Sequence, residues 1–364
     1  MKKNKPDKII LTIVISLVIY GLVIFSSASL GLLARGGARF SSIIANQILF
    51  GIFLGGLFAY IASKINYKIW GKYSFWLWVI SIIATLAVFI PGLGFSHGGA
   101  RRWIIIAGLS IQPAEFLKIA YIIYVAAWLS RIKEEVRTFK YGFLPFVIIS
   151  GITIFPLLFQ PDIGTTIVIL ISGTVLYFLS GSNLKHLLLV GLLGLILFGI
   201  LIMVKPYIWS RLMTFFDHSI DSQGSSYQIQ QSLIAVGSGQ LTGRGFGQSL
   251  QKFHYLPEPI GDSVFAVASE EFGFIGMIIL VLLFLSLAIR SLYLSSKIKD
   301  MFGSLILSGI AVSIVAQSFF NMGAMLGIFP LSGLPLIFVS HGGTAMFFSL
   351  LSIGIILNVT RKNN

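Results

Sequence analysis

The residues that could do acid–base chemistry gather in one stretch, Gln251–Gly276, which reads QKFHYLPEPIGDSVFAVASEEFGFIG. Pro257 and Pro259 prevent a regular helix at its start, and the sequence turns apolar after Asp262. Asp262 is therefore predicted where a membrane helix meets an aqueous face, and ionisable groups at such places are functional candidates. A general base there would need the carboxylate. The alternative, that Asp262 only caps the helix, stays open because Asp is among the favoured N-cap residues.

Two pairs of charged residues could bind an anionic substrate. Arg101 and Arg102 are adjacent and precede Trp103, and guanidinium groups form bidentate bonds with phosphate oxygens. The pair therefore suits a phosphate at headgroup level, or it only snorkels to bulk phospholipid. Glu115 and Lys118 are three residues apart and share a helix face. They either line a polar cavity near Asp262 or form a self-neutralising pair that tolerates burial.

The remaining acidic residues have more ordinary interpretations. Glu270 follows Asp262 by eight residues, which places it about 12 Å further along the helix and roughly on the same flank. Glu271 points to the opposite side. Gln160–Asp162 is predicted to be a tight turn in which Asp162 caps the next helix. No His, Asp or Glu cluster has metal-ligand spacing, so the sequence indicates no resident cofactor and leaves a divalent cation open.

The elements that must position these residues are membrane helices. Hydrophobic residues make up 56% of the 364 residues and charged residues 10%, whereas soluble proteins have about 25% charged residues. The net charge of +14 comes from basic residues spread over short loops, which the positive-inside rule explains better than nucleic-acid binding does. The absence of cysteine excludes disulfides and thiol chemistry. The composition predicts an all-α polytopic membrane protein.

Ten apolar blocks are close to the roughly 20 residues that span a bilayer. They predict spans at about 9–29, 43–63, 73–91, 114–130, 143–159, 163–180, 184–204, 263–289, 302–326 and 335–357. Seventeen of the 26 basic residues then lie in segments on the side of the termini and eight on the other side. This asymmetry predicts that both termini are cytoplasmic and that Asp262 is extracytoplasmic.

Two extracytoplasmic segments are longer than the topology requires. The segment Pro91–Gln112 contains GGARRWI, and a large loop of about 205–262 joins the seventh and eighth helices. Loops of this length are usually functional or disordered, and this one ends at Asp262, which favours function. Its YQIQQSLIAV run predicts a short amphipathic helix on the membrane surface.

Five separated motifs resemble those of the SEDS proteins (shape, elongation, division and sporulation), a family that includes FtsW and RodA, polymerases of lipid II, and SpoVE. The motifs are GARRWI, QPAEFLK, QPDIGT, the YLPE to EEFGFIG segment and NMGAMLGIFPLSGLPLIFVSHGG. The resemblance covers essentially the whole chain and matches the ten spans. It implies a single SEDS-type transmembrane domain over residues 1–364, with Asp262 as the catalytic carboxylate and Glu115 and Lys118 close to it.

Within this family, the chain looks more like the FtsW branch than the RodA branch. The run SYQIQQSLIAVGSG and the following GRGFGQSLQKFHYLPE carry that likeness. One departure is the IGDS context of Asp262, where the family usually has HTDF. The carboxylate is in place, but its neighbouring contacts are expected to differ from the family pattern.

The resemblance implies a peptidoglycan glycosyltransferase that polymerises lipid II on the outer face of the cytoplasmic membrane, in septal wall synthesis. Asp262 would be the general base on the acceptor hydroxyl. Arg101, Arg102 and Lys118 would meet the charge of the departing undecaprenyl pyrophosphate, with Glu115 beside them. The implied partners are a class B penicillin-binding protein, which is an FtsI-like transpeptidase, and other divisome proteins.

Three other functions fit parts of the sequence. A lipid II flippase would also be a polytopic bundle with charges inside the membrane, a RodA-like enzyme would act in elongation, and a scaffold would have no chemistry. A transporter is expected to use midplane charges and related repeats. Here the carboxylate is at the outer interface and no repeat is evident, which favours the enzyme. Polymer formation from labelled lipid II by the purified protein would discriminate among them.

Overall fold

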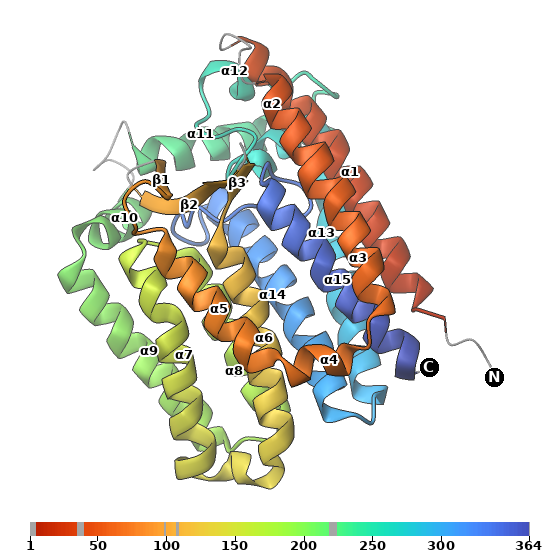
Figure 1. Cartoon of the computed structure of the whole chain (residues 1–364). Helices are drawn as coiled ribbons and strands as arrows, with labels where there is room; N and C mark the ends of the chain where they lie inside the picture. The colour runs from red at the N-terminus through yellow and green to blue at the C-terminus, as the bar shows by residue number, and fades with distance from the viewer. Residues whose placement is uncertain (1–4, 35–39, 98–99, 107–108, 218–223, 364) are drawn as a thin grey trace.

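The chain folds into a bundle of membrane-length helices with a small sheet at one end (Figure 1). A computed structural model describes residues 5–34, 40–97, 100–106, 109–217 and 224–363. The bundle helices are α1 (Lys8–Ala34), the continuous α2, η1 and α3 (Phe40–Ala45, Asn46–Leu54 and Gly55–Lys64), α5 (Ser74–Ala87), α6 (Pro113–Ile132), α7 (Leu144–Phe159), α8 (Ile163–Leu179), α9 (Leu184–Val204), α13 (Val264–Lys297), α14 (Met301–Met325) and α15 (Gly343–Asn363). This confirms the predicted all-α polytopic fold.

Shorter elements connect these helices. They are α4 (Tyr67–Lys72), η2 (Lys133–Arg137), η3 (Phe139–Phe143), α10 (Pro206–Phe216), α11 (Ser225–Ser238), α12 (Gln251–His254) and the strands β1 (Gly94–His97), β2 (Ala100–Ile106) and β3 (Leu109–Ile111). The run YQIQQSLIAV lies in α11, so the helix predicted for it is present. The antiparallel sheet β1-β2-β3 was not predicted, and its central strand carries the residues Ala100–Trp103 of the GARRWI motif.

The ten predicted spans all coincide with apolar helices. In the part of the chain that the structure describes, eight helices are long and apolar enough to cross a membrane, and α5 and α8 are shorter apolar helices at the third and sixth predicted spans. The predicted start of the last span at residue 335 is wrong, because α15 begins only at Gly343. The preceding residues form an irregular loop that contains Pro330 and Pro335, and proline interrupts helical hydrogen bonding.

The two ends of the bundle differ in character (Figure 1). We call the end that carries the sheet, α10, α11 and α12 the sheet end, and the end at which both chain termini lie the terminus end. The sheet is joined to the bundle by a hydrogen bond of 2.8 Å from Thr344 Oγ1, at the start of α15, to the carbonyl of Ser110 in β3. The functional side chains predicted from sequence are positioned mainly by the sheet end.

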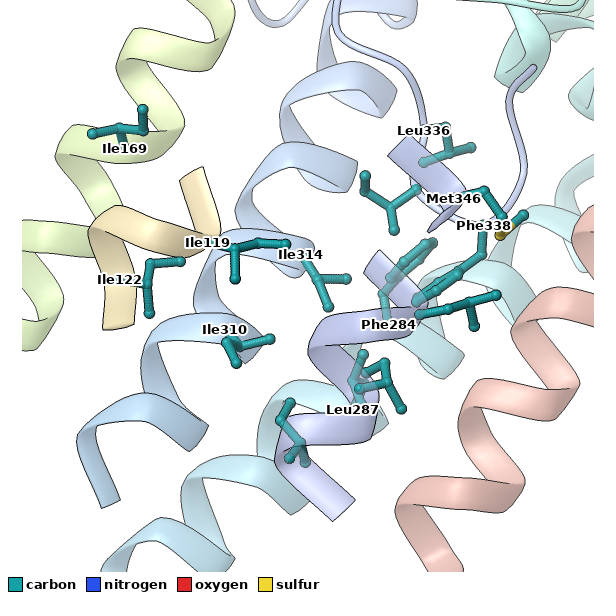
Figure 2. Packing of buried hydrophobic residues seen from close by; sticks show 14 of the residues in the cluster. Ile119, Ile122, Ile169, Phe284, Leu287, Ile310, Ile314, Leu336, Phe338 and Met346 are labelled. Atoms are coloured by element: carbon teal, nitrogen blue, oxygen red, sulfur yellow. The ribbon is translucent and has the colours of Figure 1, made fainter. Parts of the chain in front are cut away.

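The hydrophobic core lies where α6, α8, α13, α14 and α15 converge (Figure 2). Figure 2 shows buried side chains from these helices, among them Ile122, Phe284 and Ile310, each at most 2% exposed. Phe338, from the loop before α15, packs into the same cluster. The loop between α14 and α15 is therefore part of the core, which fixes its backbone relative to the helices.

Helix α13 is interrupted at Gly273, whose φ of 62° lies in the left-handed region that glycine tolerates. The break releases two backbone carbonyls and two amides, and the outer loop supplies partners for all four. The bonds run from Arg244 N to Glu270 O (2.9 Å), Gly245 N to Glu271 O (3.0 Å), Phe274 N to Gln240 O (2.9 Å) and Ile275 N to Leu241 O (3.1 Å). Unpaired backbone groups are costly in a membrane, so the loop and the helix are interdependent.

Candidate functional site

Asp262 lies in a tight turn directly before α13. The carbonyl of Glu258 accepts hydrogen bonds from the amides of Gly261 (3.0 Å) and Ser263 (3.2 Å), and these bonds close the turn. The N-cap position of α13 is occupied by Ser263, and no side chain caps it by a hydrogen bond. The helix-cap interpretation of Asp262 is therefore wrong for this structure, and its carboxylate is available for another role.

A glycine brings the Asp262 carboxylate and the Arg102 guanidinium together. A Cβ atom placed on Gly333 would lie 3.6 Å from Oδ2 of Asp262 and 3.9 Å from Nη1 of Arg102. Gly333 also has a φ of +70°, a conformation that glycine adopts at little cost. Both charged groups therefore lie within 4 Å of the same point beside Gly333, and the positive φ of Gly333 disfavours any larger residue there.

Arg102 is held in place by its other nitrogen atoms. Nε donates a hydrogen bond of 3.0 Å to the carbonyl of Gln160, and Nη2 donates to the carbonyl of Pro161. Asp162 follows these residues and accepts from the amide of Thr165, which confirms the predicted cap of α8. The arginine motif and the QPD turn thus form one unit that directs the Nη1 group of Arg102 toward Asp262.

Arg101 lies apart from this unit. Neighbouring residues of a strand point to opposite faces, and the Arg101 side chain is exposed while Arg102 is half-buried. The structure therefore does not bring Arg101 to the same position as Arg102 and Asp262, and it leaves Arg101 on the surface of the sheet end.

A second arginine that the sequence analysis did not single out, Arg211, joins the site from α10. Its Nη1 atom donates a hydrogen bond of 3.1 Å to the carbonyl of Leu331, in the same loop as Gly333. Burial lowers the pKa of Arg211, and the nearby positive charge of Arg102 lowers it further, while Asp262 acts in the opposite direction. Two guanidinium groups that repel each other beside one carboxylate make an environment that favours an additional anion.

Burial raises the pKa of the Asp262 carboxyl to about 6. The negative charge of Glu258 contributes to the increase, while Arg211 and Arg102 partly oppose it. The residue keeps partial exposure to solvent. A carboxylate whose pKa is close to neutral can accept a proton from a substrate and return it to water, which is the behaviour required of a general base.

Glu115 and Lys118 lie deeper, on α6. Lys118 Nζ is 2.9 Å from Glu115 Oε2, both side chains are at most 5% exposed, and Lys118 also donates to the side chain of Gln317 on α14. These three residues line a cavity of about 20 Å³, which is room for roughly one water molecule. The pair is therefore both a compensated ion pair and part of a small polar cavity.

Polar residues of α14 connect this cavity to the site. Gln317 Nε2 donates to the carbonyl of Pro335 (3.1 Å). Asn321, one helical turn further, donates from Nδ2 to the carbonyls of Asp262 (2.8 Å) and Leu334 (2.7 Å). The Glu115–Lys118 pair thus reaches Asp262 through α14 and the loop that carries Gly333, without contacting its carboxylate directly.

Glu270 and Glu271 do not join the site. They belong to a buried charge cluster that links α13 to α1 and the outer loop, and consists of Ser27, Arg244, Ser249, Lys252, Glu270 and Glu271. Lys252 is fully buried, and its Nζ lies 2.7 Å from Glu271 Oε1. Ser249 Oγ donates to Glu270 Oε2 at 2.6 Å. Both carboxylates are occupied by partners within the chain.

Sequence reasoning found the carboxylate and one arginine of the site but missed the residues that hold them. Arg211 is a single arginine in a long loop, and no spacing marks it. Asn321 and Gln317 could have been found as polar residues on the face of an apolar helix. Among the described residues, no group of three or more His, Asp or Glu side chains could hold a metal ion.

The chain is similar to known proteins over its whole length. A model of the FtsW, RodA and SpoVE family, described as "Cell cycle protein", matches residues 7–364. Stage V sporulation protein E of Bacillus subtilis is 36% identical over 99% of this chain and 98% of its own length. A protein of Geobacter sp. (strain M18) named "Probable peptidoglycan glycosyltransferase FtsW" is 33% identical over 98% of this chain and 97% of its own.

Two solved structures have the same fold. A structure described as "Structural coordination of polymerization and crosslinking by a peptidoglycan synthase complex" matches with a TM-score of 0.76 and 26% identity, over 96% of this chain and 97% of that chain. The crystal structure of the rod shape determining protein RodA of Thermus thermophilus matches with a TM-score of 0.72 and 25% identity, over 98% and 97% of the two chains.

Proposed function

The chain belongs to the family of FtsW, RodA and SpoVE cell cycle proteins, and we infer that it is a peptidoglycan glycosyltransferase that polymerises lipid II into glycan strands. Its FtsW-like relatives support a role in septal wall synthesis during division. The observation that carries the chemistry is the meeting of Asp262 and Arg102 across Gly333, with Arg211 beside them.

We assign the role of general base to Asp262. The acceptor hydroxyl of lipid II loses its proton to the Asp262 carboxylate, and its oxygen bonds to C1 of the donor sugar. The C1–O bond to the pyrophosphate breaks, and the electron pair leaves with undecaprenyl pyrophosphate. Attack opposite the α-linked leaving group inverts C1 and gives a β-linked strand. The pKa of about 6 leaves Asp262 largely ionised at neutral pH, as this step requires.

The pyrophosphate is the anion that suits the two site arginines. Arg102 directs Nη1 toward Asp262 while its other nitrogen atoms are held by backbone carbonyls, so its orientation is fixed before substrate binds. Arg211 contributes a second positive charge. Fixed positive groups at the leaving group stabilise the charge that develops there. Arg101 is placed to meet lipid phosphate from the exposed face of the sheet end.

In this proposal Glu115 and Lys118 act on the site indirectly, through the residues that lie between them and Gly333. Lys118 contacts Gln317, which contacts the backbone of Pro335, two residues beyond Gly333. The pair therefore supports the loop that holds Gly333 beside Asp262 and Arg102. A change at Lys118 should alter the rate through the position of the loop, whereas a change at Arg102 should alter binding of the pyrophosphate.

The basic residues support a topology in which both termini are cytoplasmic and the sheet end is extracytoplasmic. Lipid II would then be polymerised on the outer face of the cytoplasmic membrane, at the division septum. The natural partner is a class B penicillin-binding protein of the FtsI type, together with other divisome proteins. A relative in fold is described in a complex that coordinates polymerisation and crosslinking, which supports such an assembly.

The test is incubation of the purified protein with fluorescently labelled lipid II, with and without the partner transpeptidase. Glycan strands separated on a gel are the expected product, and a muramidase should digest them because the linkage is β. If labelled lipid II crosses the membrane of reconstituted vesicles but no polymer forms with the partner present, the protein is a transporter and the assignment fails.

A further inference from the structure

A groove of about 600 Å³ opens between α1, α3 and α15 at the terminus end, far from Asp262. Its outer wall consists of α1 side chains such as Leu11, Ile15 and Ile19, which are 37% to 58% exposed. Its floor is apolar and buried, with Val14 at 4% and Ile353 at 2% exposed. An apolar channel with a closed floor and an open side suits a flexible hydrocarbon chain.

The length of the groove matches one leaflet of a bilayer. On α3 and the adjoining η1 it runs from Lys64 to Ile52, which is about 18 Å at 1.5 Å per residue. On α15 it runs from Arg361 to Leu350, which is about 16.5 Å. Half of a hydrocarbon core is about 15 Å thick. The groove therefore ends near the middle of the membrane, where the chains of a phospholipid also end.

The mouth of the groove is positively charged. Lys5, Lys64 and Arg361 line it, and none of its described lining residues is acidic. The Lys64 ammonium lies 4.9 Å from the centre of the Tyr60 ring, which keeps it at the mouth. Basic pockets between membrane helices at this level bind anionic headgroups. An apolar transmembrane helix of a partner would offer no negative charge to Lys5 and Lys64.

The one acidic residue near this end of α1 does not offset that charge. Asp7 precedes α1 and is paired with Arg290 of α13, with Arg290 Nη2 2.5 Å from Asp7 Oδ2. Its backbone amide also donates to Thr360 Oγ1 at 3.3 Å. These contacts turn Asp7 toward α13 and α15 and fix the start of α1 beside the groove.

We propose that this groove binds one anionic phospholipid of the leaflet at the terminus end. The headgroup phosphate lies among Lys5, Lys64 and Arg361, and the acyl chains follow the apolar channel toward Ile52. The lipid would fill the space between α1 and the α3–α15 pair, which pack closely because Gly354 faces the backbone of Ala59. This site is independent of the polymerase reaction.

Gly56 provides a way to block the channel without disturbing the helices. It lines the groove, and a Cβ atom at this position would meet no atom within 4 Å. Gly56→Phe is therefore expected to fill the channel and exclude the acyl chains. Gly199→Phe on α9 is the matched control, because a Cβ there also meets no atom within 4 Å and Gly199 lies outside the groove.

The experiment measures lipid that stays bound to the full chain in detergent micelles doped with equal amounts of phosphatidylglycerol and phosphatidylcholine, by native mass spectrometry. Each cation near an anionic lipid contributes about fivefold. The wild-type protein and Gly199→Phe should therefore retain phosphatidylglycerol with at least a tenfold preference. The triple variant Lys5→Gln, Lys64→Gln, Arg361→Gln should lose the preference, and Gly56→Phe should lose the lipid.

A second triple variant, Lys68→Gln, Lys72→Gln, Lys140→Gln, removes three exposed lysines outside the groove and should keep the preference. The proposal is overturned if this control loses the preference as fully as the first triple variant, or if Gly56→Phe retains phosphatidylglycerol like the wild type. A dimer that dissociates in Gly56→Phe, with unchanged lipid retention, would assign the groove to protein contact instead. If Gly56→Phe fails to fold, the two triple variants decide.

Discussion

Asp262 and the pair Glu270 and Glu271 lie only about eight residues apart in sequence, but their carboxylates have opposite surroundings. Glu270 and Glu271 are surrounded by donors in the buried charge cluster, including a lysine 2.7 Å from Glu271 and backbone amides of the outer loop. Asp262 is half-buried, and burial and Glu258 raise its pKa to about 6 despite two nearby arginines. A buried charge that has all its partners serves the structure. A charge that is incompletely compensated, like that of Asp262, marks a candidate site where a substrate can provide the missing interactions.

The same contrast separates Lys252 from the arginines of the site. Lys252 is fully buried, and contacts with Ser27 (3.1 Å) and Glu271 (2.7 Å) compensate its charge. The site arginines use backbone carbonyls as partners, which fix their orientation without neutralising their charge. Substituting an amide for a carboxylate at each place therefore tests the comparison with nearly isosteric changes.

The largest expected effect is that of Asp262→Asn. Loss of a general base typically reduces the rate about 10² to 10⁴-fold, so lipid II polymerisation should be almost abolished. The raised pKa means that ionised Asp262 destabilises the fold as pH rises from below 4 through about 6. Thermal unfolding at pH 7.5 should therefore show a melting temperature at or above that of the wild type. Strong glycan synthesis by a well-folded Asp262→Asn protein would sink the mechanism.

Glu271→Gln should have the opposite profile. It leaves the Lys252 ammonium buried without its ionic partner, and breaking a buried pair in this way costs about 3–5 kcal/mol. The melting temperature in detergent should fall, while polymerisation per folded molecule should stay within a few-fold of the wild type. Replacing both partners with apolar residues, Lys252→Met and Glu271→Leu, should recover much of the loss. A stable but inactive Glu271→Gln protein would contradict the structural role.

Arg102→Lys keeps the positive charge but loses the planar group that two carbonyls hold. A hydrogen bond to a charged group contributes about 1.5–3 kcal/mol, so polymerisation should fall about tenfold to a hundredfold. Arg101→Lys is the control on the same strand, and its exposed side chain predicts a change below about threefold. Equal rates for wild type and Arg102→Lys would mean that the guanidinium does not hold the leaving group.

The last prediction concerns the pH dependence of the rate. Asp262 must be ionised to accept a proton, so the rate should fall about tenfold per pH unit below about 6. Glu258→Gln removes a negative charge that raises the pKa of Asp262, so the fall in rate should occur at lower pH in this variant. Unfolding measured at each pH separates ionisation from loss of structure. If the fall in rate at acidic pH occurs at the same pH in Glu258→Gln as in the wild type, a group other than Asp262 causes it.

Much of the fold could be predicted because membrane helices need long apolar blocks, and these are visible in composition alone. The sheet could not, because its strands are short and lie in a segment that the predicted topology required only as a connection. The break in α13 was also hidden, since Gly273 lies within an otherwise apolar run and the partners of the released backbone groups are some 30 residues away.

The site was predictable where chemistry limits the residue type. Asp262 and Arg102 stood out because charged groups at a membrane interface are costly and have specific uses. The separation of Arg101 from Arg102 depends on the strand that the sequence did not predict. Arg211 reaches the site only because α10 packs beside the loop that carries Leu331, and this contact cannot be predicted from the spacing of residues in the sequence.

The exchanged hydrogen bonds at Gly273 have a consequence for how the protein is made. The loop around residues 240–245 supplies two donors and two acceptors, and it leaves the ribosome before α13, so these groups have no partner in α13 until that helix has been made. Until the two meet, α13 enters the bilayer with an unclosed gap in its backbone, and the amides of Phe274 and Ile275 are open to exchange with water. The backbone of α13 is therefore fully hydrogen-bonded only once this loop has docked on it.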